Sequence, residues 1–176
     1  MVAEAPSIRE LFQKCRRSAW HLEMRDGYMK SDPSYIAWAR GERKTAEDFD
    51  PERRPWLRLM RESTDRGIEV RRARIVSEPV SDYIRFEHHV TDPNVAAGEK
   101  VKWLPRRQAT DLALPGNDFW LFDEEVLLVH HFDGEGELAP VDAHELVEDP
   151  AVIKLCGTAF EAIWSRAVPH EEYRLS

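Results

Sequence analysis

The apolar positions of this chain change period several times, and each change marks the border of a predicted element. From Ile8 to Ala19 the apolar residues recur at helical spacing, after a capping box formed by Ser7 and Glu10. Between Trp20 and Arg25 apolar and polar residues alternate, which is the pattern of a half-buried strand. The N-terminal part therefore predicts a helix followed directly by a strand.

Prolines mark the start of most later helices, because proline is favoured at the first helical position. Asp32 and Asp149 stand before two of these prolines as N-caps, and glycines such as Gly67 stand where helices end. The predicted helices begin at Pro33, Pro55, Pro79, Asp92-Pro93 and Pro150. The last helix has a predicted buried stripe of Val152, Cys156, Ala159, Phe160, Ile163 and Ala167.

Runs of β-branched and aromatic residues lie between these helices and predict strands. They span Ile68 to Val76 and Val101 to Leu104, and a hairpin joins Asp118–Phe122 to Val126–Phe132. The stretch Glu42–Arg54 is polar and predicts a connection. Helices between strands favour parallel crossovers, whereas the hairpin adds an antiparallel edge. We expect a single α/β or α+β domain over residues 1–176, with a mixed β-sheet flanked by helices.

The charge balance opposes direct binding to nucleic acids. The 176 residues include 25 Lys and Arg against 33 Asp and Glu, a formal net charge of -8, whereas nucleic-acid binding depends on a basic footprint. One basic run, Arg71, Arg72 and Arg74, lies on a predicted strand, and we interpret it as a solvated strand edge. DNA contact through this run is the weaker alternative, and we expect no direct nucleic-acid partner.

Neither a membrane span nor a disulfide framework is predicted. No apolar run reaches the ~18 residues that a span requires, and the N-terminal residues lack the apolar stretch of a secretion signal. The two cysteines, Cys15 and Cys156, fall on apolar helical stripes, where a thiol is a small buried hydrophobe. We therefore expect a cytoplasmic protein without membrane contact, and we leave open whether it forms a homodimer.

No complete catalytic constellation is present in the sequence. The pairs His88-His89 and His130-His131 lack further ligands at useful spacing, so we expect no metal. Neither a glycine-rich phosphate loop nor a Gly-x-Ser-x-Gly elbow is found, so we also expect no cofactor and no serine nucleophile. Asp118 and Asp123 flank an apolar strand, and they can share a site only if one of them lies in a turn.

The region from Gly67 to Asp133 resembles the phospholipase D-like fold. The resemblance rests on the order strand, helix, strand and hairpin, and it implies the same fold here. Active members carry a His-x-Lys motif followed by Asp, and alignment on Asp123 places Gly116 at the histidine and Asp118 at the lysine. The resemblance thus implies a phospholipase D-like domain without that catalytic activity.

Nearly the whole chain, from Ile8 to Tyr173, also resembles a family of actinobacterial proteins that is defined only as a domain of unknown function. Genes of this family often lie beside genes for helix-turn-helix regulators, so the resemblance implies a regulatory setting. It rests on Leu22-Glu23-Met24-Arg25-Asp26-x-Tyr28, Pro79-x-Ser81-x-Tyr83-x-Arg85, Gly98-Glu99 and Leu114-Pro115-x-x-Asp118-Phe119-Trp120-Leu121-Phe122-Asp123.

We therefore expect a non-catalytic regulatory or interaction module that binds a partner protein, such as a helix-turn-helix regulator, or a small effector. The acidic charge favours a basic partner. The alternative is an enzyme, a hydrolase or transferase for a phosphorylated or nucleotide substrate. In that case Arg74 and Arg85 bind the anion, and Asp118 or Asp123 is the base. The candidate binding residues are Glu23, Arg25, Asp26, Arg74, Tyr83, Arg85, Asp118, Trp120 and Asp123.

Overall fold

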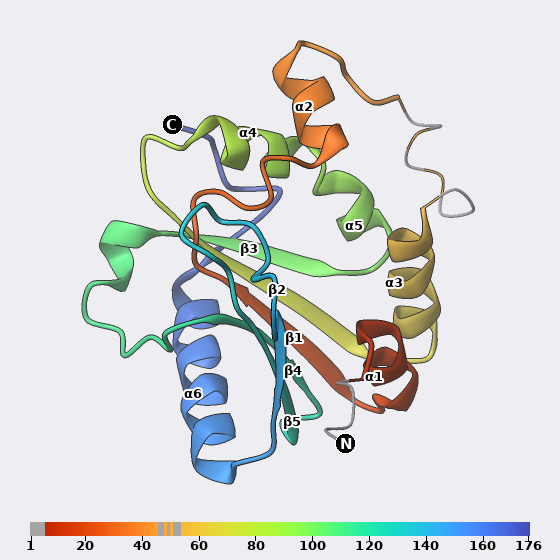
Figure 1. Cartoon of the computed structure of the whole chain (residues 1–176), viewed down its shortest axis with the longest axis vertical. Helices are drawn as coiled ribbons and strands as arrows, with labels where there is room; N and C mark the ends of the chain where they lie inside the picture. Colours follow the sequence, from red (N-terminus) through yellow and green to blue (C-terminus); the bar gives the residue numbers. More distant parts are fainter. Residues whose placement is uncertain (1–5, 46–47, 49, 51–53) are drawn as a thin grey trace.

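A seven-stranded mixed β-sheet forms the centre of the computed structural model, which describes residues 6–45, 48, 50 and 54–176 (Figure 1). The spatial order is β6-β5-β4-β1-β2-β3-β7. Strands β1, β2 and β3 run parallel, and every other pairing is antiparallel. The predicted mixed sheet flanked by helices is confirmed. The strands are β1 (Ser18–Glu23), β2 (Glu69–Val76), β3 (Lys100–Pro105), β4 (Asp118–Phe122), β5 (Val126–His130), β6 (His144–Val147) and β7 (Val168–Pro169).

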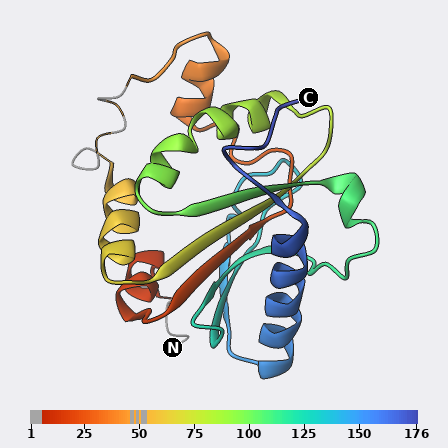
Figure 2. The same ribbon diagram turned by 180° about the vertical axis from the view of Figure 1, so that it is seen from behind.

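Helix α6 (Pro150–Arg166) covers one face of the sheet, and the chain then returns through β7 beside β3 (Figure 2). Side chains at alternate strand positions, such as Trp20, Leu22 and Leu121, form one apolar cluster with Phe160 of this helix. α6 has 17 residues. No helix in the described ranges combines the length and the apolar character that crossing a membrane requires.

The opposite face carries the other helices in two groups. Helices α1 (Ile8–Lys14) and α3 (Pro55–Asp65) pack over one end of the central strands. Helices α2 (Pro33–Ala39), α4 (Asp82–His89) and α5 (Asp92–Ala96) lie toward the other end (Figure 1). Each group has its own apolar cluster, and the polar side chains of the strands lie between the two clusters.

Local signals predicted most helix starts. The expected capping box forms at α1, and α2, α3 and α6 begin at the predicted prolines. Helix α4 is a correction, because it begins at Asp82 rather than at Pro79. The hydroxyl of Ser81 accepts the Ile84 N–H at 3.2 Å and so supplies the N-cap.

Two residues that were predicted to lie on the buried stripes of helices do not lie there. Helix α1 ends at Lys14, and Ala19 belongs to β1, where it pairs with both β2 and β4. Val152 is 40% exposed, because α6 turns Ile153 toward the sheet instead. Strands β6 and β7 and the short 3-10 helix Arg106–Ala109 were not predicted. Within the predicted connection Glu42–Arg54, residues 46–47, 49 and 51–53 lie outside the described residues.

The interpretation of the basic run as a solvated strand edge is wrong. β2 lies between β1 and β3, and Arg72 and Arg74 are only 8% and 4% exposed. Arg71 points to the α6 face, where it pairs with Glu69 and Glu161. The neighbours of a strand are long-range contacts, so the sequence pattern could not show that this strand is internal. Two buried guanidinium groups require paired carboxylates, because an unpaired buried charge is unstable.

Candidate functional site

Polar side chains from five strands share the sheet face opposite α6. Side chains alternate between the faces of a strand, so residues two apart lie together, and the register then aligns them across the sheet. The face holds His21 and Glu23 of β1, Arg72 and Arg74 of β2, Asp118 and Trp120 of β4, His130 of β5 and His144 of β6.

These side chains line a cavity of about 370 Å³ between the two helix groups. That volume falls in the range of small-molecule sites, roughly 300–1,000 Å³. Rings from five residues add flat apolar walls to the charged floor. They belong to Tyr28, Trp56, Tyr83, Trp120 and Phe132.

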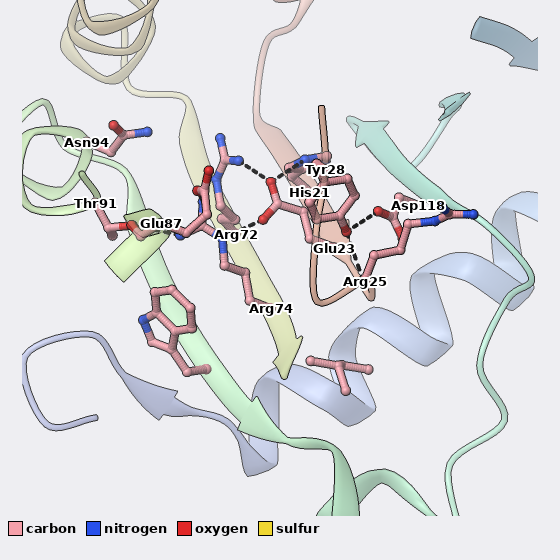
Figure 3. A network of polar contacts seen from close by, with 12 residues as sticks. His21, Glu23, Arg25, Tyr28, Arg72, Arg74, Glu87, Thr91, Asn94 and Asp118 are labelled. Atoms are coloured by element: carbon pink, nitrogen blue, oxygen red, sulfur yellow. Dashed lines mark hydrogen bonds and ion pairs between the residues drawn. The ribbon is translucent and has the colours of Figure 1, made fainter. Parts of the chain in front are cut away.

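Glu23 is the centre of a buried ion cluster (Figure 3). Its Oε1 accepts from Arg72 Nη1 at 2.5 Å and from His21 Nε2 at 3.0 Å, and its Oε2 accepts from Arg74 Nε. Burial raises the pKa of Glu23, but Arg74 and Arg72 outweigh it and hold that pKa well below its usual range. Glu23 is therefore ionised, and it fixes the orientation of three side chains.

Two more carboxylates complete the cluster. Glu87 Oε2 accepts from Arg74 Nη2 at 2.5 Å, and Glu99 Oε1 accepts from Arg72 Nε at 2.6 Å. The hydroxyl of Thr91 accepts from Arg74 Nη1 at 2.7 Å. Each guanidinium nitrogen of Arg74 thus has a partner, whereas Arg72 Nη2 donates to none of the described residues. This nitrogen is not fully enclosed by protein atoms, and Arg72 lines the cavity, so the nitrogen is open to the cavity.

His21 extends the cluster toward β4. Its Nδ1 lies 2.7 Å from the Phe119 carbonyl oxygen, and its Nε2 lies 3.0 Å from Glu23 Oε1. Its ring stacks on Trp120, with ring centroids 4.3 Å apart. Glu23, Glu87 and Glu99 are thus each bonded to an arginine, and Glu23 also contacts His21.

Asp118 is a fourth buried carboxyl group, and it is not bonded to either arginine. It is 3% exposed and lines the cavity. Its Oδ1 accepts the Met24 N–H at 3.0 Å, and its Oδ2 accepts from the hydroxyl of Tyr28. Burial raises the pKa of Asp118 above its ordinary value, despite the opposing hydrogen bond from Tyr28. Burial and the negative charge of Asp118 also raise the pKa of Tyr28 well above 10, so the phenol keeps its proton.

His130 and His144 close the cavity on the β5–β6 side. Their Nδ1 atoms lie 2.9 Å apart. Burial, with His21 and His144 nearby, lowers the pKa of His130 to about 3, so this ring is neutral near pH 7. No group of three or more His, Cys, Asp or Glu residues with the geometry of a metal site occurs in the described ranges.

The structure brings together five of the nine predicted binding residues. Glu23, Arg74, Tyr83, Asp118 and Trp120 all line the cavity. The other four lie elsewhere. Arg25 places its guanidinium over the Phe132 ring, 5.0 Å from the ring centroid. Asp26 accepts hydrogen bonds from the N–H and the hydroxyl of Ser77. Arg85 donates to the Ser176 carbonyl oxygen, and Asp123 lies in the β4–β5 turn.

Several cavity residues were missed by the sequence analysis. Tyr28 belongs to the motif that contains Glu23, and His21 directly precedes that motif. The alternation of β1 could have identified His21 as a neighbour of Glu23 on the same face. Glu87, Thr91 and Asn94 reach the cavity from α4 and α5. Their role depends on how these helices cross β2, and no local signal in the sequence shows it.

Asp123 stabilises the turn at the far end of β4. Its carboxylate accepts the backbone N–H groups of Arg16, Arg17 and Ser18 at 2.9, 2.7 and 3.0 Å. Burial disfavours the charged form, but these N–H groups outweigh it and hold the pKa of Asp123 below its usual value. Asp123 therefore ties the entry of β1 to the hairpin and does not face the cavity around Asp118.

Asp123→Asn is expected to reduce the free energy of unfolding by about 1–2 kcal/mol near neutral pH, because charge-assisted hydrogen bonds are lost. The pKa of Asp123 is lower in the folded chain than in the unfolded chain, where it is about 3.9. The ionised carboxylate therefore stabilises the fold above about pH 3.9, and this stabilisation is lost as the pH falls through the pKa of the folded state. The difference between wild type and variant should therefore shrink below about pH 4. Urea unfolding followed by circular dichroism at several pH values measures it. Exposed Glu124→Gln is the control, and an equal loss in both variants would contradict the assignment.

The fold and the cavity define an α/β domain that encloses a paired ion cluster behind aromatic walls. Residues 6–175 match the family described as Domain of unknown function (DUF6879), and the chain belongs to this family. No curated protein matches the sequence significantly.

Solved structures resemble this fold at low sequence identity. The archaeal chromatin protein TrmBL2 is similar with a TM-score of 0.47 and 13% identity over 91% of this chain and 48% of TrmBL2, so this chain spans about half of that protein. Nuc from Salmonella typhimurium, a phospholipase D family member, has a TM-score of 0.48 and 9% identity over 94% of this chain and 88% of Nuc. NucT from Helicobacter pylori has a TM-score of 0.48 and 10% identity over 92% of this chain and 87% of NucT.

Proposed function

We propose that this chain is a non-catalytic module that binds a small effector in the cavity around Glu23. The supporting observation is that the cavity is preformed and that its charged floor is held by internal ion pairs. A site whose side chains are already fixed loses little conformational freedom on binding. The aromatic walls supply apolar contact area for such a ligand.

The alternative, an enzyme for a phosphorylated or nucleotide substrate, has less support from the geometry. Arg74, the proposed anion binder, already donates from each of its three nitrogens to Glu23, Glu87 and Thr91. Arg85 and Asp123 do not line the cavity. Of the groups expected for this reaction, which were both arginines and either Asp118 or Asp123, only Arg74 and Asp118 line the cavity.

Ligand binding can be tested by thermal shift with a library of small metabolites, together with mass spectrometry of molecules that copurify with the native protein. A ligand at 100 times its dissociation constant stabilises the folded state by about 2.7 kcal/mol, which raises the melting temperature by several degrees. Leu138→Trp should abolish the shift, because Leu138 lines the cavity. Leu175→Trp is the matched control, because both leucines are 36% exposed and Leu175 lies outside the cavity.

A shift that survives Leu138→Trp would place the ligand elsewhere and contradict the proposed site. Turnover of a phosphorylated substrate that is lost in Leu138→Trp but retained in Leu175→Trp would establish the enzyme alternative. The absence of any stabilising or copurifying molecule would remove the effector proposal.

The partner we propose is a helix-turn-helix transcription regulator in the cytoplasm. Its support is the gene neighbourhood that the resemblance to the actinobacterial family implies, together with the net charge of -8, which complements a basic DNA-binding protein. Affinity purification of the tagged chain from its host should recover such a regulator in stoichiometric amounts. If no regulator is recovered with or without added effector, the partner proposal fails and the effector proposal remains.

A further inference from the structure

We infer that the cavity selects a small organic cation, an amine attached to an apolar or aromatic body, and that the ammonium group pairs with Asp118. This inference rests on the proposed function and narrows it to one class of ligand. Its basis is the charge balance of the buried groups around the cavity.

The other buried charges of the cluster are already matched. Glu23 is paired with both arginines and His21, Glu87 is paired with Arg74, and Glu99 is paired with Arg72. Arg72 and Arg74 lie on β2, separated from β4 by β1. A ligand therefore meets carboxylates that are already paired on one side and the carboxyl group of Asp118 on the other.

Asp118 forms no ion pair among the described residues. Its two hydrogen bonds come from a backbone N–H and a phenol, which are both uncharged. The backbone N–H of Arg25 donates to the Tyr28 hydroxyl beside Asp118 (Figure 3). The Arg25 guanidinium lies over the Phe132 ring, 5.0 Å from its centroid. His130, the cross-strand neighbour of Asp118, is neutral. A buried carboxylate without a counter-ion is unfavourable, and a bound ammonium group removes that penalty.

The walls beside Asp118 suit a cation with an apolar body. Tyr28, Trp120 and Phe132 line the cavity with their rings, and the faces of such rings attract ammonium groups. Arg72 Nη2 is a second group that points to a ligand, because its side chain is 9% exposed and this nitrogen lacks a partner among the described residues. It can donate to an oxygen atom at the end of the ligand far from the amine.

Isothermal titration with a matched set of indole compounds tests this inference. Tryptamine carries an amine, tryptophol carries a hydroxyl group in the same place, and indole-3-propionate carries a carboxylate. Tryptamine is expected to bind at least about tenfold more tightly than tryptophol, because a charged hydrogen bond is worth more than a neutral one. Asp118→Asn should reduce this preference to about twofold or less.

Leu138→Trp and Leu175→Trp show whether binding occurs in the cavity, as in the test of the proposed function. If tryptophol or indole-3-propionate equals or exceeds tryptamine, or if only neutral or anionic compounds bind in the cavity, the cation inference fails and the proposed function stands. If no compound binds in the cavity, the cation inference fails, and the thermal-shift and copurification experiments still decide the proposed function. Should Asp118→Asn not fold, the comparison of the three compounds on the wild-type chain still decides the preference for a cation.

Discussion

Glu23→Ala is expected to lower the free energy of unfolding by about 3–5 kcal/mol, because it leaves buried cations without their shared counter-ion. Glu23 is bonded to Arg72, Arg74 and His21, and both arginine side chains are less than 10% exposed. Since the total stability of a domain is about 5–15 kcal/mol, the loss is large enough to unfold part of the population at 37 °C. Urea unfolding followed by circular dichroism and tryptophan fluorescence measures it.

Glu125→Ala is the matched control for this prediction. Glu125 also pairs with an arginine, Arg17, but the two side chains are 72% and 64% exposed. Exposed ion pairs contribute about 0–1 kcal/mol, so this variant should resemble the wild type. Glu23→Gln should fall between the two, because its amide oxygen can still accept a hydrogen bond. A loss below about 1 kcal/mol in Glu23→Ala would show that the cluster is not needed for stability.

The proposed ligand binding depends on the same ion cluster that stabilises this face of the sheet. The arginines, His21 and the carboxylates hold one another in place, so the cavity keeps its shape without a ligand. Such clusters contribute more to geometry than to net stability, because desolvation offsets much of the Coulomb attraction. The cluster therefore acts as a rigid base, and Asp118 and the aromatic rings remain available for recognition.

Elements with local signals were predictable from the sequence. Pro55 and Asp149 act through the first turn of their own helices, and Gly67 adopts the positive φ that follows α3. Strand β6 was missed because its four residues, His144–Val147, form a strand only through pairing with β5. Strand β7 has two residues and depends in the same way on β3.

The candidate site was predictable only in part, for the same reason. Glu23 and Asp118 were identified from their motifs, yet nothing local shows that β1 and β4 are neighbours, which brings these residues to one cavity. Arg72 and Arg74 were assigned to a solvated edge, because their burial follows from the position of β2 inside the sheet. Asp118 and Asp123 appeared as a pair in the sequence, but they stand at opposite ends of β4.

Phe160→Ala is expected to lower the free energy of unfolding by about 3–5 kcal/mol, the usual effect of removing a fully buried aromatic ring. Phe160 is 0% exposed, and its ring stacks on Trp20 and on Trp164 with centroids 5.2 and 5.7 Å away. Leu155→Ala on the same helix is the control, because Leu155 is 52% exposed. That variant should remain within about 0.5 kcal/mol of the wild type.

The Phe160 variant also tests whether the two faces of the sheet act independently. Phe160 belongs to the apolar α6 face, whereas the cavity lies on the other face. At a temperature where the variant is still folded, its affinity for tryptamine should therefore stay within about twofold of the wild type, since distant sites act independently. Isothermal titration measures this affinity, and unfolding in urea measures the stability of the same preparation. A large loss of affinity in the folded variant would show that packing under α6 controls the cavity and that the two faces do not act independently.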